Sequence, residues 1–190
     1  MSLENIKKQI DILRLQIEKL IADLRNKEFN KTIPNLPKPE YIIVHHGGGE
    51  YNFYQVNKHH IELWGMISSL GFGCGYQYFI EYSGLVYNAR RDTEEGAHTV
   101  GPLPNYYNRS SIGMCLQGNA NLKPPTQSQL NSLDDLIGRK QEQYGIPNNK
   151  ILGHKEVSLY STDCPGKHLW KWLCEHYPSM GRHKKLLKNV

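Results

Sequence analysis

Two histidines and one cysteine, far apart in the sequence, are the residues best suited to do chemistry together. His45 ends an apolar run, His154 follows a short one, and Cys164 lies in a polar loop. Two imidazoles and a thiolate suit a borderline-soft ion such as Zn²⁺, and three protein ligands leave a fourth position open for water. If the three side chains converge, the sequence predicts a catalytic zinc site and a hydrolase.

A second histidine, His46, directly follows His45 and is followed by three glycines. Successive side chains of a strand point to opposite faces, so only one of the two imidazoles can bind a metal from a regular strand. We expect His46 to flank or support the site. The glycines at 47–49 would keep the approach to the metal open.

The elements that must position these residues alternate between apolar runs and helical patterns from Glu40 onward, which predicts an α/β fold with a mixed central sheet flanked by helices. The expected strands are residues 41–46, 76–82, 85–89, 111–117 and 151–153, with Ser83-Gly84 as a hairpin turn. The expected helices are residues 56–70, 126–145 and 166–177, the second opened by a capping box at Thr126. Residues 90–109 are expected to be irregular.

A heptad pattern precedes this domain. Leucine and isoleucine recur at alternating spacings of three and four, which predicts an amphipathic, coiled-coil-like helix over residues 1–29. The helix could pair with another copy of the chain or with the body of its own domain; we favour a homo-oligomer, because further apolar residues widen its face. Residues 30–39 contain three prolines and indicate a linker. The main domain is then residues 40–178, and residues 179–190 form a basic tail.

The net charge of +5 does not indicate a nucleic-acid partner. Residues 181–190 carry four basic and no acidic side chains, and the central domain is neutral, so it has no basic stripe. No apolar run approaches the ~18 residues that a membrane span needs, so we expect none. The charged N-terminus is unlike a secretory signal, which predicts synthesis in the cytoplasm, where the four cysteines stay reduced.

Five short blocks carry a family resemblance. They occur in order between residues 43 and 166: Ile43–His46, Gly75–Phe79, Gly96–Thr99, Ser111–Gly118, and Gly153–Val157 followed by Thr162–Gly166. Together they resemble the zinc-dependent N-acetylmuramoyl-L-alanine amidases of the phage lysozyme and peptidoglycan recognition protein family. The resemblance implies the same mixed-sheet fold and a zinc amidase domain over residues 40–178.

The resemblance also implies roles for individual residues. It assigns Zn²⁺ to His45, His154 and Cys164, and it makes Tyr76 and Thr162 the catalytic residues that hydrogen-bond the charge developing on the substrate. It places His98 in the substrate groove. We expect further substrate contacts from His46, which flanks the site, and from Asn108 and Arg109, at the end of a polar and aromatic segment.

One position departs from part of the family. Relatives that recycle cell-wall fragments carry a glutamate base where this chain has Cys115, and a buried thiol cannot replace a carboxylate base. Proton transfer should then depend on the zinc-bound water and Tyr76. Glu156 is a second candidate base, although we favour a role in orienting an imidazole or in a loop ion pair.

The function that the resemblance implies is hydrolysis of the amide bond between N-acetylmuramic acid and L-alanine in bacterial peptidoglycan. The alternative is a peptidoglycan-binding module without catalysis, because some relatives bind the polymer and lack the metal cysteine. The presence of Cys164 favours the enzyme. We expect a phage or prophage endolysin that reaches the cell wall after lysis or as part of a virion.

Overall fold

The computed structural model describes residues 13, 17, 38–101, 103 and 105–178. The chain divides into two compact units, residues 1–36 and 37–190. Nearly all of the expected helix over residues 1–29, most of the linker over 30–39 and the basic tail over 179–190 lie outside the described residues and stay predictions. Two of the heptad positions, Leu13 and Ile17, are helical and exposed.

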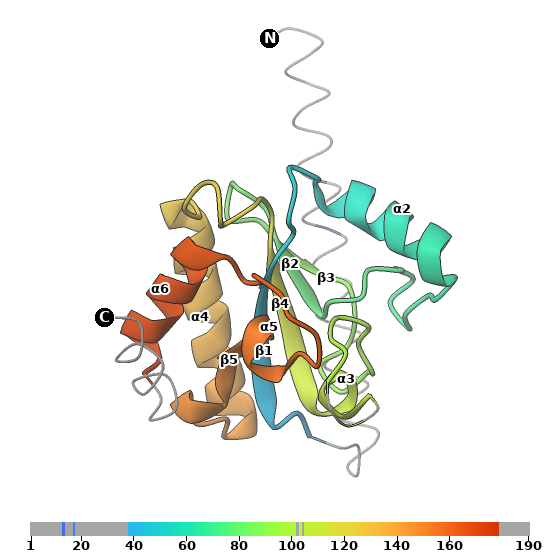
Figure 1. Cartoon of the computed structure of the whole chain (residues 1–190). Helices are drawn as coiled ribbons and strands as arrows, with labels where there is room; N and C mark the ends of the chain where they lie inside the picture. The colour runs from blue at the N-terminus through green and yellow to red at the C-terminus, as the bar shows by residue number, and fades with distance from the viewer. Residues whose placement is uncertain (1–12, 14–16, 18–37, 102, 104, 179–190) are drawn as a thin grey trace, which may run out of the picture. The chain divides into compact units, whose positions relative to one another are not determined.

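A five-stranded mixed sheet forms the centre of the second unit (Figure 1). Its strands are β1 (Tyr41–His46), β2 (Tyr78–Ile80), β3 (Val86–Asn88), β4 (Ser111–Leu116) and β5 (Ile151–Gly153). They lie in the order β3-β2-β4-β1-β5, with β1 parallel to both β4 and β5. β2 is parallel to β4 and antiparallel to β3. The expected mixed sheet and its hairpin are confirmed.

Helices flank this sheet. α4 (Gln127–Tyr144) and α6 (Lys167–His176) lie together on one side of it, and α2 (Phe53–Trp64) lies on the other (Figure 1). Shorter pieces are α3 (Tyr106–Ser110), the 3₁₀ turn η1 (Asn148–Lys150) and α5 (His154–Val157). Among the residues that the structure describes, no helix is both long and apolar enough to cross a bilayer.

Two sequence expectations about helices were wrong. α2 was expected over residues 56–70, but it begins at Phe53 because Asn52 and Gln55 form a reciprocal capping box. It ends at Trp64, because the following Gly65 has a φ of 64°, the left-handed conformation that terminates helices. Residues 90–109 were expected to be irregular, but their last part forms α3.

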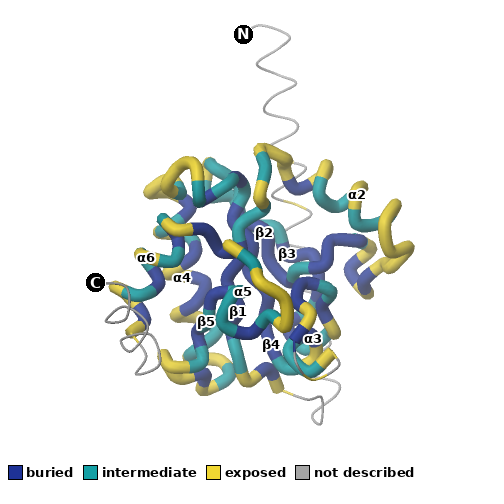
Figure 2. The backbone as a smooth tube through the Cα atoms, in the orientation of Figure 1, coloured by how far each residue is buried: buried dark blue, intermediate teal, exposed yellow. Residues whose placement is uncertain are grey.

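The strand alternation sorts the core into two clusters. Ile42, Val44, Ile112 and Met114 belong to a cluster with the apolar residues of α4 and α6. Cys115 belongs to the second cluster, with residues of β2 and α2, which include Phe79 and Phe53. Figure 2 shows β4 and most of β1 as buried, whereas most residues of α2 are exposed or intermediate. His45 alternates with Val44 and therefore lies on the face of the second cluster.

Candidate metal centre

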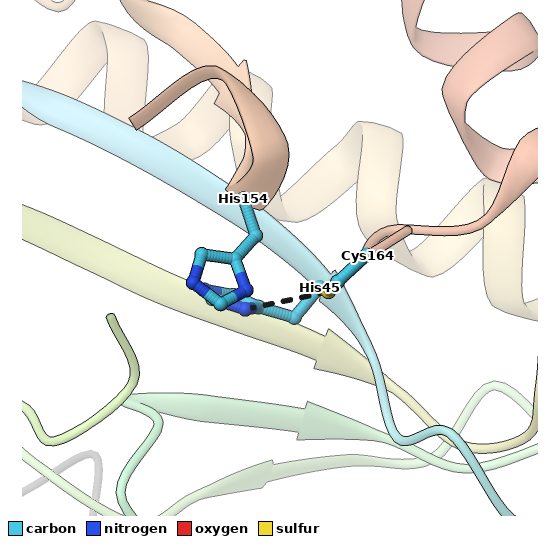
Figure 3. A group of neighbouring side chains, drawn as sticks. All are labelled: His45, His154 and Cys164. Atoms are coloured by element: carbon cyan, nitrogen blue, oxygen red, sulfur yellow. Dashed lines mark hydrogen bonds between the residues drawn. The ribbon is translucent and has the colours of Figure 1, made fainter. Parts of the chain in front are cut away.

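His45, His154 and Cys164 converge from three different elements (Figure 3). His45 lies near the end of β1, His154 is the first residue of α5, and Cys164 lies in the loop before α6. One ligand atom of each lies within 4.8 Å of the others. The Sγ atom of Cys164 is 3.7 Å from Nδ1 of His45, and the His45 and His154 ring centroids are 4.5 Å apart. The structure thus brings together the three residues predicted from the sequence.

Strand pairing explains why the two histidines meet. β1 and β5 are parallel, with Val44 opposite Gly153, and the residue that follows each of these in the chain is one of the two converging histidines, His45 and His154. α5 then starts at His154 with a cap: the backbone N–H of Gly153 donates to Oε2 of Glu156 over 2.7 Å. Glu156 therefore helps to fix the helix turn that carries a ligand, which favours a positioning role for this carboxylate over that of a base.

The donor set fits a zinc ion. Bonds of 2.0–2.3 Å in a tetrahedral site hold the ligand atoms about 3.5 Å apart, close to the 3.7 Å between Cys164 Sγ and His45 Nδ1. Nε2 of His154 is buried and has no hydrogen-bond partner among the described residues. An unpartnered buried imidazole nitrogen is costly in a closed core and suits a residue whose partner is a metal or substrate.

The surroundings of the trio favour metal binding over protonation of its imidazoles. Burial, followed by the neighbouring His98 and His154, lowers the pKa of His45 well below its ordinary value. Burial also lowers the pKa of His154 to about 4. Burial raises the pKa of the Cys164 thiol to about 12, so a cation must displace its proton. Zn²⁺ binds neutral imidazoles and a thiolate, so the two histidines are already in the required state, and binding must release the proton of Cys164.

The two expected catalytic residues lie beside the trio. The ring of Tyr76 is half-buried, with its centroid 5.0 Å from that of His45. Burial, and then the nearby thiols of Cys115 and Cys164, raise the pKa of Tyr76 well above its ordinary value, so its hydroxyl is a hydrogen-bond donor at neutral pH. The hydroxyl of Thr162 accepts a bond of 3.2 Å from the backbone N–H of Cys164. Their catalytic roles stay predictions.

Cys115 is fully buried in β4, on the same face of the sheet as His45, and lies opposite His45 in the β1–β4 pairing. Burial, and then the neighbouring Cys164 and Cys74, raise the pKa of this thiol well above its ordinary value. The thiol is therefore protonated at neutral pH, as expected for a buried strand residue, and cannot serve as a base.

The four expected substrate-contacting residues fall into two pairs. His98 lies against the trio, with Nδ1 3.1 Å from Nε2 of His45. Asn108 is buried, and its amide oxygen accepts bonds from the backbone N–H groups of His98 and Thr99. The other two are engaged elsewhere: Nδ1 of His46 accepts from the N–H of Ala120, and Arg109 forms an exposed ion pair with Glu95. Contacts of all four with substrate stay predictions.

Two cavities meet at Tyr76. The first, of about 690 Å³, adjoins the trio and has a largely apolar wall; its lining includes Tyr76, His98, Asn108, His154, Leu63, Trp64, Met66 and Val100. The second, of about 460 Å³, is lined along α2 by Tyr51, Gln55, Lys58, His59, His60 and Glu62, among others. The first cavity therefore lies beside His154, and the second extends from Tyr76 along α2.

Tyr51 lines the second cavity, whereas Tyr106 and Tyr107 pack edge-on against Tyr41. The apolar wall at the end of α2 was missed. Its signal was an exposed tryptophan, Trp64, at the end of a helix whose buried face already held Phe53.

Comparisons with known proteins agree with this geometry. A family model described as N-acetylmuramoyl-L-alanine amidase matches residues 35–167. Peptidoglycan-recognition protein SC1b of Drosophila melanogaster is 29% identical over 141 residues, which cover 68% of this chain and 69% of that protein. The solved structure of the amidase LysC from Clostridium intestinale superposes with a TM-score of 0.60 at 25% identity, covering 73% of this chain and 84% of that one. Drosophila PGRP-LB superposes with a TM-score of 0.60 at 26% identity, covering 75% and 82%.

Proposed function

The chain belongs to the N-acetylmuramoyl-L-alanine amidase family, and we propose that it hydrolyses the amide bond between N-acetylmuramic acid and L-alanine in bacterial peptidoglycan with the help of Zn²⁺. The observation that carries this proposal is the convergence of His45, His154 and Cys164 beside a cavity. The substrate class follows from the family and from relatives whose names record amidase activity or peptidoglycan recognition.

The three converging residues would hold the metal. When bound, zinc polarises a carbonyl and lowers the pKa of water to about 7, which supplies a nucleophile at neutral pH. Tyr76, whose raised pKa keeps its hydroxyl protonated, would donate a hydrogen bond to the oxygen that gains charge. Thr162 lies in the same loop as Cys164, and its hydroxyl oxygen accepts a hydrogen bond from the Cys164 N–H. It would add a second polar contact to the substrate. The apolar wall around Trp64 and Met66 borders the space in which the substrate would lie.

The competing function is binding of peptidoglycan without hydrolysis; the names of several relatives record recognition of peptidoglycan. A binding module needs the groove but not the metal ligands. In this chain all three ligands are present and their donor atoms are close enough to share one ion. A protonated tyrosine lies beside them as well. These features favour the hydrolase.

The test combines metal analysis with product analysis. The purified full chain should contain about one zinc per molecule and should release new L-alanine N-termini from purified cell wall. A chelator should abolish the release, and added zinc should restore it. A zinc-loaded chain that binds cell wall but exposes no L-alanine N-termini would identify a binding module. A chain that retains no zinc would refute the metal assignment.

A further inference from the structure

A line of buried polar groups continues from the His45 ring nitrogen that faces away from Cys164. Nε2 of His45 is 3.1 Å from Nδ1 of His98, and Nε2 of His98 is 3.4 Å from Oγ of Ser111. Oγ of Ser111 lies 2.5 Å from the carbonyl oxygen of Tyr107. The side chains of His45, His98 and Ser111 are all buried. The opposite ring nitrogen of His45, Nδ1, faces Cys164.

The position of each proton along this line follows from its far end. The Tyr107 carbonyl can only accept, so the single hydroxyl proton of Ser111 is donated to it. The Ser111 oxygen must then accept from His98, which places the His98 proton on Nε2. A neutral imidazole with its proton on Nε2 has a lone pair on Nδ1, and that lone pair accepts from His45 Nε2–H. The same reasoning leaves the Nδ1 lone pair of His45 directed at the trio.

The backbone holds the His98 ring in a slot between two glycines. A Cβ atom added to Gly113 would lie 2.6 Å from Cδ2 of His98, and one added to Gly96 would lie 2.5 Å from the same atom. The backbone N–H of His98 is fixed in addition by the side chain of Asn108, over 3.0 Å. The ring can therefore occupy its place only because both neighbours lack a side chain.

We propose that His98 is a positioning residue for the metal: by accepting the hydrogen bond of His45 Nε2–H, it selects the tautomer that presents His45 Nδ1 to zinc. The inference rests on the proposed zinc site and adds a role to the groove lining that His98 also provides. Outer partners of metal-binding histidines fix ring orientation and tautomer, and their loss commonly weakens metal affinity by about 10–100-fold.

A matched pair of variants separates the hydrogen bond from the bulk of the ring. Asparagine can place its Oδ1 atom near the position of Nδ1 and still accept from His45, whereas leucine has a similar size and no acceptor. We expect His98→Leu to weaken zinc binding by about 10–100-fold in competition with a chromogenic chelator, and His98→Asn to remain close to the unaltered chain. Gly113→Ala, which displaces the ring without altering any ligand, should weaken zinc as His98→Leu does.

His60 provides the control, because it is another histidine near the site that accepts a backbone hydrogen bond, from Gly75, but does not belong to this line. His60→Leu should keep the zinc affinity of the unaltered chain. If His98→Leu binds zinc as tightly as His60→Leu, the inference is wrong. A chain that binds no zinc before any substitution refutes the proposed function instead, so the two failures are distinguishable.

A spectroscopic measurement needs no variant and decides the question if His98→Leu does not fold. Long-range ¹H–¹⁵N NMR of the zinc-loaded chain reports which nitrogen of each imidazole carries the proton. We expect a proton on Nε2 of both His45 and His98, with the metal on Nδ1 of His45. A proton on Nδ1 of His98, or zinc on Nε2 of His45, would overturn the proposal.

Discussion

The two faces of the central sheet are built from alternate residues of the same strands, and they differ in kind. On the face covered by α4 and α6, β1 and β4 contribute mostly large aliphatic side chains such as Ile42 and Met114. On the other face the same two strands contribute His45, Gly113 and Cys115 among others. The first face is closed by apolar packing, and the second keeps small and polar residues around an imidazole.

Because successive residues of a strand point to opposite faces, one strand can place core residues on one face of the sheet and site residues on the other. The face covered by α4 and α6 supplies apolar burial, which is the main favourable term in folding. The site face gives up part of that burial: Gly113 leaves room for the His98 ring, and Ser111 accepts from it. Substitutions on the two faces should therefore have different consequences, which the following experiments measure.

The largest effect on zinc binding and activity should follow from removing one of the three proposed zinc ligands. Cys164→Ser replaces the thiol with a hydroxyl, which is a poor zinc ligand at neutral pH, so we expect zinc content and amidase activity both to fall to background. Cys174→Ser, at a half-buried position of α6, is the matched control and should retain both. Metal analysis and the release of L-alanine N-termini measure the outcome. Retention of zinc by Cys164→Ser would remove that residue from the ligand set.

On the face covered by α4 and α6, a substitution should lower the stability of the fold and leave zinc binding unchanged. Ile112→Ala leaves a cavity in a fully buried position and should lower the free energy of unfolding by about 2–5 kcal/mol. Urea denaturation at saturating zinc measures this loss. The folded fraction should still bind zinc with the same stoichiometry, because Ile112 points away from the trio. Loss of zinc from a chain that remains folded would show that the two faces are coupled.

The sequence was sufficient for elements whose signals are local. The strands followed from short apolar runs, and α4 from the capping box at Thr126 and the glycine, Gly145, that follows its last residue. The start of α2 was misplaced although Asn52 and Gln55 carry the same kind of signal, so that error lay in the interpretation and not in the chain. The short helix α3 has no periodicity long enough to detect.

The site was predictable only where a resemblance linked distant blocks. No spacing rule relates His45 to Cys164, and neither residue alone indicates a metal. The contact between His45 and His98 joins residues 53 positions apart, and it depends on two glycines that leave room for the ring. Nothing local in the sequence reports that a glycine in a strand is facing an imidazole. Such contacts require the three-dimensional structure.

Within the site face, Tyr76 should separate metal binding from catalysis. Tyr76→Phe removes the hydroxyl donor and keeps the ring beside His45, so kcat should fall by about 10²–10³-fold. The zinc content should not change, because the phenol is not one of the converging ligands. Steady-state hydrolysis of a soluble muropeptide, with metal analysis of the same sample, measures both. Unchanged kcat would exclude the tyrosine from the reaction.

The smallest expected effect comes from substitutions of two neighbouring residues in β1. They compare the two faces of the sheet most directly. Ile42 and Ile43 are both fully buried in β1 and face opposite sides of the sheet. Replacing either with valine removes one methyl group and should cost about 0.5–1.5 kcal/mol of unfolding free energy. Ile42→Val should leave zinc binding unchanged to within about 0.5 kcal/mol, as expected for independent sites. Ile43→Val lies on the face of His45 and should change zinc binding more than Ile42→Val does. Equal zinc affinities in the two variants would mean that the site depends on its polar contacts alone and not on the packing of the face that carries it.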